Sequence, residues 1–290
     1  MIKILVTGAT GFIGKYVVKH LLSLGHTIIT TARKNAEEAV SCFPELKDTH
    51  YIQKDLNDQE KNYYSFFNKP DIAIHTSWEG LPHYDALYHI ERNLLSNYYF
   101  IKNIIGNGLG DITVTGTCLE YGLLEGCLSE NTSTKPCTNY GLAKDTLRKF
   151  VEALQNNYSF VCKWLRLFYP YGQGQQQKSL WGQMQDAIST NAKEFNMSPG
   201  EQLRDLFPVE KAAEYIVSTA IQKEITGIIN CCTGNPVSVR RFAEEFFEQR
   251  AYPIKLNLGY YPYSRHEPLA FWGDNKKLLR IVDTDKKFRQ

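Results

Sequence analysis

No two cysteines in this sequence have the C-x-x-C spacing, and no other cysteine spacing is typical of a metal site. The seven cysteines are Cys42, Cys118, Cys127, Cys137, Cys162, Cys231 and Cys232. Such a set indicates reduced thiols, so we expect a cytoplasmic protein. His75 and His83 belong to no group of histidines and carboxylates with ligand spacing, so we predict no metal.

Long apolar runs and an excess of one charge are also missing. No apolar run has the length needed to cross a membrane, and MIKILVTGATGFIG lacks the apolar length and cleavage pattern of a secretory signal. The net charge of +2 is too small to indicate binding to nucleic acid or a membrane surface. With 43% hydrophobic and 22% charged residues, the 290-residue chain is ordinary for a soluble globular protein of one large or two small domains.

Short β-rich runs alternate with helical patterns through the first half of the sequence. The expected strands are 2–6, 27–31, 50–53, 71–76, 112–115 and 159–168, and the expected helices are 12–24, 84–105 and 140–155. This order predicts an α/β fold, a Rossmann-type doubly wound parallel sheet with right-handed crossovers.

After about residue 170 the pattern becomes mixed α+β. Helices are expected at 180–190, 208–222 and 238–249, and a strand at 227–231. We predict a sheet domain over 1–170 and a smaller substrate lobe over 171–290, with elements around 205–232 able to return to the sheet. The lobe would cover the carboxyl edge of the sheet, where ligands bind in such folds. The charged tail DTDKKFRQ predicts a frayed end.

The stretch TGATGFIG follows the first expected strand and opens the first expected helix. Its glycines permit a tight turn, close approach of a pyrophosphate, and close packing of helix on strand. A helix N-terminus also favours anionic phosphates. A plain glycine-rich turn is the alternative, but the motif has the context that it requires, so we predict a dinucleotide site in residues 1–170. Its expected contacts are Gly8, Gly11, Phe12, Ile13, Gly14, Asp55, Leu56, Thr76 and Ser77.

The second expected strand ends in TIITTARKN, where a site for NAD usually has an acidic residue. Arg33 and Lys34 stand there instead. A guanidinium can pair with a 2′-phosphate through two parallel hydrogen bonds, so the sequence favours NADP(H) over NAD(H). The alternative is a pair of solvated cations after a strand. Asp55 is positioned to accept a hydrogen bond from the adenine amino group.

Tyr140 and Lys144, in TNYGLAK, are four residues apart on an expected helix and so share one face. A neighbouring lysine charge favours the phenolate, so we expect Lys144 to lower the pKa of Tyr140 and make it a proton donor or acceptor near neutral pH. By itself such a pair is more often an ordinary exposed one.

Several motifs occur together in one order: TGATGFIG, Asp55-Leu56, TGTCLEYG at 115–122, YGLAK at 140–144, RLFYPYG at 166–172, GEQLRDLF at 200–207 and HEPLAFWGD at 266–274. With them the chain resembles the extended short-chain dehydrogenase/reductase family, the nucleotide-sugar epimerases, dehydratases and reductases, over nearly its whole length. The resemblance implies that Thr117 hydrogen-bonds the reacting oxygen of the substrate, that Tyr140 is the acid or base, and that Lys144 binds the nicotinamide ribose. Asn93 matches an asparagine of the family whose expected role is structural, supporting the active-site strand, and it is also an expected cofactor contact; an ordinary helix asparagine is the alternative.

The sequence departs from the dehydratases of this family. They carry Asp-Glu directly after the threonine, whereas this chain has Cys118 and Leu119, which cannot act as acid and base for water elimination. Glu120 comes one position later, and its register predicts a structural role. A 4-epimerase with tightly bound NAD and a 4-keto reductase with exchangeable NADPH remain, and Arg33 with Lys34 favours the reductase.

The expected substrate is therefore a nucleoside-diphosphate 4-keto-6-deoxyhexose, dTDP-linked before CDP- or GDP-linked, of deoxysugar and O-antigen-type biosynthesis. Arg204 and Arg265 match arginines near the diphosphate in the family, although ion pairing with Asp205 or Glu267 is an equal alternative. Cys118 is expected to line the sugar site. A dinucleotide-binding protein without activity is disfavoured because Thr117, Tyr140 and Lys144 are all present. The resemblance also predicts a homodimer formed by helices 84–105 and 140–155.

Overall fold

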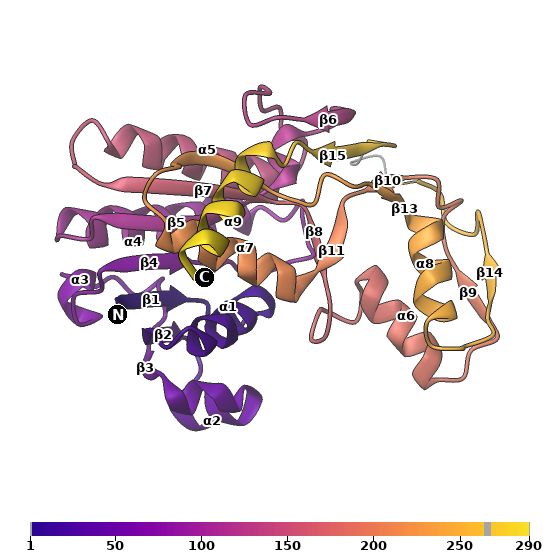
Figure 1. Ribbon diagram of the computed structural model, residues 1–290, viewed down its shortest axis with the longest axis horizontal. Coiled ribbons are helices and arrows are strands. Elements are labelled where there is room, and N and C mark those ends of the chain that lie inside the picture. The colour runs from indigo at the N-terminus through magenta and orange to yellow at the C-terminus, as the bar shows by residue number, and fades with distance from the viewer. Residues whose placement is uncertain (1, 264–267, 290) are drawn as a thin grey trace.

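The computed structural model describes residues 2–263 and 268–289 and is built around a seven-stranded sheet (Figure 1). Every strand pairing in this sheet is parallel. The strand order is β3-β2-β1-β4-β5-β7-β12, so the chain starts near the centre and winds outward in both directions, which confirms the predicted doubly wound fold. The strands are β1 (Lys3–Thr7), β2 (Thr27–Ala32), β3 (His50–Gln53), β4 (Ile72–His75), β5 (Asp111–Thr117), β7 (Val161–Leu167) and β12 (Gly227–Cys231).

Both faces of the sheet are buried under helices, which explains why strands such as β1 and β4 carry apolar residues on both faces. In β1, Ile4 and Val6 belong to one core cluster and Leu5 to the other, because successive side chains point to opposite faces. The first face carries α1 (Phe12–Ser23), α7 (Val209–Ile221) and α9 (Lys276–Arg289). The second carries α3 (Tyr63–Phe66), α4 (Leu95–Gly106) and α5 (Asn139–Leu154).

A smaller lobe lies beyond the carboxyl ends of the strands (Figure 1). Its core contains Met184, Phe195, Phe242, Phe246 and Phe247. The lobe is built from α6 (Leu180–Ser189), α8 (Val239–Glu248), β9 (Glu194–Asn196) and β14 (Lys255–Asn257). Short ladders connect it to the sheet: β8 (Tyr169–Tyr171) with β11 (Leu206–Pro208), β10 (Leu203–Arg204) with β13 (Val237–Ser238), and β6 (Gly126–Leu128) with β15 (Phe271–Gly273).

The chain passes between the sheet and the lobe more than once. After entering the lobe at α6, it returns to the sheet with α7 and β12, goes back to the lobe with α8, and ends on the sheet with α9. Residues 209–231 and 276–289 therefore lie with the sheet although they follow residue 170. The helix α2 (Ala36–Cys42) follows β2 and lies at the lower edge of the molecule in Figure 1, away from the lobe.

Two sequence-based expectations about helices differ from the structure. The helix expected from Tyr84 begins later, with a π-helical segment His89–Leu94 that continues into α4. The carbonyls of Tyr84 and Asp85 instead accept hydrogen bonds from the Tyr140 amide and the Asn139 side chain, so this segment ties down α5. At the other end, α9 runs to Arg289, where a frayed tail was predicted.

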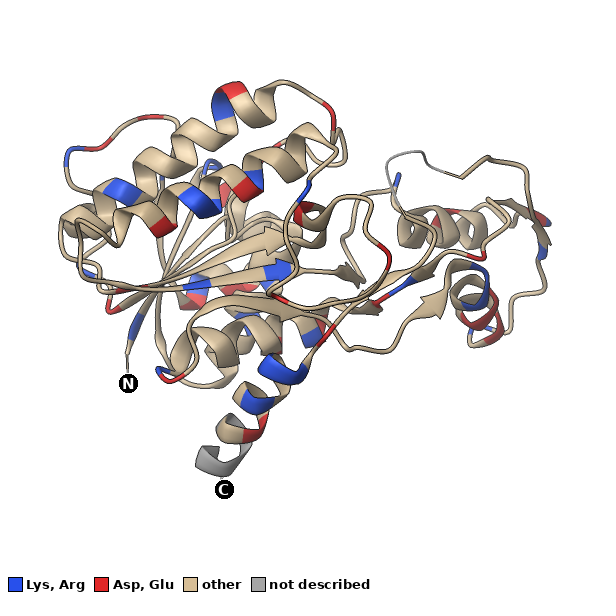
Figure 2. Ribbon diagram, turned by 90° about the horizontal axis from the view of Figure 1, so that it is seen from above, with Lys and Arg blue, Asp and Glu red and all other residues tan. Residues whose placement is uncertain are grey.

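Charged residues of both signs are interspersed along the helices that cover the sheet (Figure 2). This agrees with the small net charge of +2. Among the described residues, no helix combines the length and apolar character needed to span a bilayer.

Candidate active site

The glycine turn between β1 and α1 has the close packing that its sequence predicts. Gly8 has φ of +69°, a region that side chains with a Cβ rarely adopt. A Cβ on Gly14 would lie 2.1 Å from the Gly8 carbonyl oxygen, so the first turn of α1 can touch the loop only with glycine there. The helix N-terminus is thus held directly behind a loop without side-chain bulk, as a bound pyrophosphate requires.

A cavity of about 190 Å³ lies beside this turn, and most of the predicted cofactor contacts line it. The predicted residues on its wall are Gly8, Gly11, Arg33, Lys34, Asp55, Leu56, Thr76, Ser77 and Asn93. Thr31 also lines it, and its buried hydroxyl has no hydrogen-bond partner among the described residues. Phe12, Ile13 and Gly14 lie just outside, in the first turn of α1. The donors, the open loop and the unused hydroxyl fit the adenosine diphosphate half of a dinucleotide.

Arg33, at the end of β2, forms an ion pair. Its guanidinium lies 2.9 Å from the carboxylate of Glu79, which follows β4 and lines the same cavity. Lys34 is exposed and donates to the Cys42 sulfur at 3.0 Å. The cation and carboxylate therefore meet at the place where an adenosine ribose would lie.

Thr117, Tyr140 and Lys144 come together where β5 ends against the first turns of α5. The Thr138 side chain caps α5 by accepting from the Gly141 amide at 3.1 Å, which fixes where the helix begins. The Tyr140 hydroxyl lies beside the Thr117 side chain, which acts to lower the pKa of Tyr140. Lys144 donates to the Thr115 carbonyl at 2.7 Å, and Thr115 lies two residues before Thr117 on β5. A carbonyl oxygen placed between Thr117 and Tyr140 would meet both hydroxyls.

Burial controls the charges of this group. It raises the pKa of Tyr140 well above its usual value, and it lowers the pKa of Lys144 to about 7. The pKa of Tyr140 is thus raised and not lowered, because loss of hydration outweighs the effects of the neighbouring groups. The Tyr140 hydroxyl is protonated at neutral pH, as a proton donor must be.

Trp78 joins the cofactor cavity to the tyrosine and lysine. It lines the cavity, its ring meets the Tyr140 ring edge to face at 5.8 Å, and the Lys144 ammonium lies 4.1 Å from its centroid. The Trp78 indole nitrogen donates to His89, which packs on Tyr140 at 5.4 Å. No spacing pattern in the sequence assigns Trp78 to this place.

A chain of hydrogen bonds between β1, β4 and the helical segment 89–106 supports the site. His75 contacts Thr7 at 2.8 Å and Asn97 at 2.6 Å, and burial lowers the pKa of His75 to about 3. Asn97 donates to the Asn93 carbonyl. The Asn93 side chain in turn donates to the Glu79 carbonyl at 3.0 Å, so Asn93 supports the loop after β4 as well as lining the cavity.

Glu120 has the structural position that its register predicts. It is fully buried, and its carboxylate accepts from the Thr117 amide, the Trp164 indole and the Arg166 guanidinium. The neighbouring Cys118 is also buried. Neither an acid–base pair nor an exposed carboxylate is therefore present directly after Thr117.

Of the two predicted diphosphate arginines, the structure describes Arg204, whose side chain is hydrogen-bonded to backbone carbonyls. Arg204 is buried, donates to the carbonyls of Leu203, Pro268 and Leu269, and lies over the Phe271 ring at 5.1 Å. These contacts hold the segment that follows Arg265, which itself lies outside the described residues. Asp205, the alternative ion-pair partner expected for Arg204, accepts hydrogen bonds from Thr233 and Gly234.

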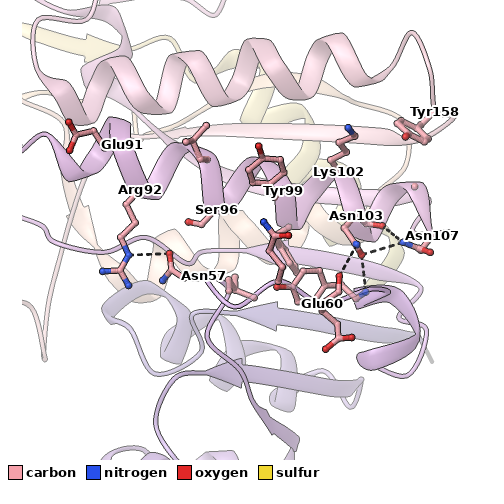
Figure 3. A pocket seen from close by; sticks show the side chains of 16 residues that line it. Asn57, Glu60, Glu91, Arg92, Ser96, Tyr99, Lys102, Asn103, Asn107 and Tyr158 are labelled. Carbon is pink, nitrogen blue, oxygen red and sulfur yellow. Dashed lines mark hydrogen bonds between the residues drawn. The ribbon is translucent and has the colours of Figure 1, made fainter.

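A larger hollow of about 600 Å³ lies elsewhere, between α4 and the segment 56–63 (Figure 3). Its polar groups largely satisfy one another: Asn103 donates to the Glu60 carbonyl, and Asn107 donates to the Asn103 carbonyl. It contains none of Thr117, Tyr140 and Lys144. The smaller cavity also contains none of the three, but Trp78 on its wall contacts both Tyr140 and Lys144, so the smaller cavity is the candidate site.

Comparisons with known proteins agree with this geometry. The model of the family described as NAD dependent epimerase/dehydratase matches residues 4–232. Two curated proteins of Aggregatibacter actinomycetemcomitans are similar to the chain. dTDP-6-deoxy-L-talose 4-dehydrogenase (NAD(+)) is 30% identical over 272 residues, covering 93% of this chain and 98% of that protein. GDP-6-deoxy-D-talose 4-dehydrogenase is 25% identical over 294 residues, covering 99% and 93%.

Solved structures show the same fold. UDP-glucuronic acid 4-epimerase from Bacillus cereus, in complex with UDP-glucuronic acid and NAD, superposes with a TM-score of 0.83 at 19% identity. The superposition covers 97% of this chain and 93% of the epimerase.

Proposed function

Because the chain belongs to the NAD-dependent epimerase/dehydratase family, we propose that it is an oxidoreductase acting at C4 of a nucleoside-diphosphate 6-deoxyhexose. The reaction is reduction of the 4-keto group with NADPH, and oxidation of the 4-hydroxyl is its reverse. The placement of Thr117 beside Tyr140, with Lys144 held against the Thr115 carbonyl, carries this proposal. The names of the two curated relatives, both 4-dehydrogenases of 6-deoxytalose nucleotides, support the position and the sugar class. The more similar one favours a dTDP-linked substrate.

Thr117, Tyr140 and Lys144 each have a distinct role in the proposed reaction. When bound, the nicotinamide supplies the hydride that reaches C4. Thr117 and Tyr140 donate hydrogen bonds to the C4 oxygen and stabilise the negative charge that develops on it. Tyr140 then gives its proton to that oxygen, so the carbonyl becomes a hydroxyl. Lys144 places positive charge near the resulting phenolate, which regains its proton from solvent.

The direct test is NADPH oxidation against a panel of nucleoside-diphosphate 4-keto-6-deoxyhexoses, with NMR of the product. We expect turnover with one or more of the panel and a 4-hydroxyl product. If no member of the panel is reduced with either NADPH or NADH, the proposed reaction is wrong.

A 4-epimerase is the second candidate, favoured by the Glu79 carboxylate, which suits the unphosphorylated ribose of NAD. An epimerase oxidises C4 and returns the hydride to the other face, so it keeps its NAD. Stoichiometric NAD released on denaturing the purified protein would favour the epimerase. A protein purified without cofactor that binds NADPH would favour the reductase.

Arg33→Ala tests the proposed preference for NADP(H). A hydrogen bond to a charged group contributes ~1.5–3 kcal/mol, so losing the contact with the 2′-phosphate should raise the KM for NADPH roughly ten- to a hundredfold. The KM for NADH should change little. Lys34 can compensate in part, so Arg33→Ala with Lys34→Ala should show the larger effect. Arg241→Ala is the matched control, because Arg241 forms an exposed ion pair with Glu245 in the lobe. Equal, small effects on the KM values for both cofactors would mean that Arg33 is a surface residue that does not bind the 2′-phosphate.

The proposed homodimer places α4 and α5 against their copies. Both helices expose large apolar side chains: Leu95 is 43% and Tyr99 49% exposed on α4, and Leu142 is 44% and Phe150 40% exposed on α5. Light scattering at micromolar concentration should give twice the chain mass, and Tyr99→Arg should halve it. Leu279→Arg, at a similarly exposed position on α9, should leave it unchanged. A monomer mass for the unaltered protein would rule out this dimer.

A further inference from the structure

Glu79 is a carboxylate at the adenosine end of the cofactor cavity that the sequence analysis did not find. It comes from the loop after β4, yet its carboxylate lies 2.9 Å from the guanidinium of Arg33 at the end of β2. Its side chain is 28% exposed, compared with 58% for Arg33, and both residues line the cavity. An acidic group is thus present beside the ribose position, although β2 itself does not supply it.

The Glu79 carboxylate oxygen that pairs with Arg33 also accepts a hydrogen bond from Asn57. The Asn57 side chain donates to Glu79 at 3.3 Å and to Asp55 at 2.7 Å. Arg92, from the π-helical segment, donates to the Asn57 oxygen at 3.2 Å, as Figure 3 shows. The backbone of Glu79 is fixed by Asn93. Two side chains from different segments, Arg33 and Asn57, therefore meet this carboxylate, and Asn93 from a third segment holds the Glu79 backbone, which is more than a chance surface ion pair requires.

The two members of the pair suit two different riboses. A carboxylate accepts a hydrogen bond from a 2′-hydroxyl, and a guanidinium donates to a 2′-phosphate. Each member also weakens the binding preferred by the other. Glu79 would repel a 2′-phosphate, and it neutralises Arg33 when the site is empty.

We propose that Glu79 is the specificity-determining residue that reads the 2′ position of the cofactor, and that its pairing with Arg33 lets one site bind both NADH and NADPH. This inference rests on the proposed function, since it assigns residues of the same dinucleotide site. Glu79 takes the role that an acidic residue at the end of β2 usually has. Arg33 gives the site its affinity for NADPH, and Glu79 reduces the resulting preference for NADPH over NADH.

The test is the dissociation constant of each reduced cofactor, measured by fluorescence titration at one fixed salt concentration. The unaltered protein should bind both. Glu79→Gln keeps the size of the side chain and removes its charge. It should tighten NADPH about tenfold and weaken NADH by up to about tenfold, the scale of one charge-assisted hydrogen bond gained or lost. Arg33→Ala with Glu79→Gln should bring the two dissociation constants close together.

Glu91→Gln is the matched control, because Glu91 lies on the same π-helical segment as Arg92 but lines the larger hollow and not the cofactor cavity. It should leave the ratio of the two dissociation constants unchanged. A Glu79→Gln protein that binds both cofactors with an unaltered ratio, or with equally weakened affinity, overturns the assignment of Glu79. If the unaltered protein binds neither cofactor, the proposed function fails together with this inference.

Discussion

Tyr140→Phe should lower turnover by ~10²–10⁴-fold, the usual contribution of a positioned acid. The substitution removes only the hydroxyl beside Thr117 and keeps the ring that packs on Trp78 and His89. The dissociation constant for NADPH should therefore stay within about twofold of the original, because the proton donor and not the site is lost. Turnover is measured with the nucleotide sugar that the unaltered protein reduces best.

Tyr84→Phe provides the control for this experiment. The Tyr84 ring lies 5.8 Å from that of Tyr140, but Tyr84 is 39% exposed and follows no strand end of the sheet. Its loss should change turnover by less than about tenfold, below the range of a general acid. Near-normal turnover in Tyr140→Phe would remove Tyr140 from the proton-transfer step and leave Thr117 as the main donor to the substrate oxygen.

Glu120→Ala should destabilise the protein by about 3–5 kcal/mol, the scale for removing one partner of a buried ion pair. Without the carboxylate, the Arg166 guanidinium, at a residue that is 1% exposed, keeps its charge and loses its ion-pair partner. The Trp164 indole and the Thr117 amide lose their acceptor as well. Urea unfolding followed by tryptophan fluorescence measures the change in free energy.

Glu152→Ala is the comparison for Glu120→Ala. Glu152 pairs with Arg148, but its side chain is 46% exposed, so its loss should cost no more than ~1 kcal/mol. If the two variants unfold at similar urea concentrations, the buried network does not hold the end of β5 in the way its geometry indicates. Loss of turnover alone, with unchanged stability, would instead point to a direct role of Glu120 in the chemistry.

The architecture could be predicted from the sequence because its signals are local and strong. The apolar run at Ile4–Val6, the glycine loop after it and the helical pattern that follows each require one kind of structure. β3 and β12 have the bounds that their residue runs predict. The start of the long helix near Tyr84 could not be found in this way, because tertiary contacts to α5 use the carbonyls that a helix would need.

The candidate site was predictable only in part, and for a physical reason. Tyr140 and Lys144 share a helix face, so their proximity follows from spacing alone. Glu79 meets Arg33 across 46 residues of sequence, and no spacing rule connects the ends of β2 and β4. The balance between burial and charge at Tyr140 likewise depends on the packed surroundings, which a sequence pattern does not contain.

The return of the chain to the sheet at β12 has a consequence for synthesis on the ribosome. β7 ends at Leu167 and its outer neighbour begins at Gly227, so sixty positions must be translated before that edge can be paired. At ~5–20 residues per second this leaves the strand uncovered for roughly 3–12 s. An unpaired strand edge is a template for association with other nascent chains. Lys163, in the middle of β7, is the kind of charged side chain that discourages such pairing until Asp111 and α7 enclose it.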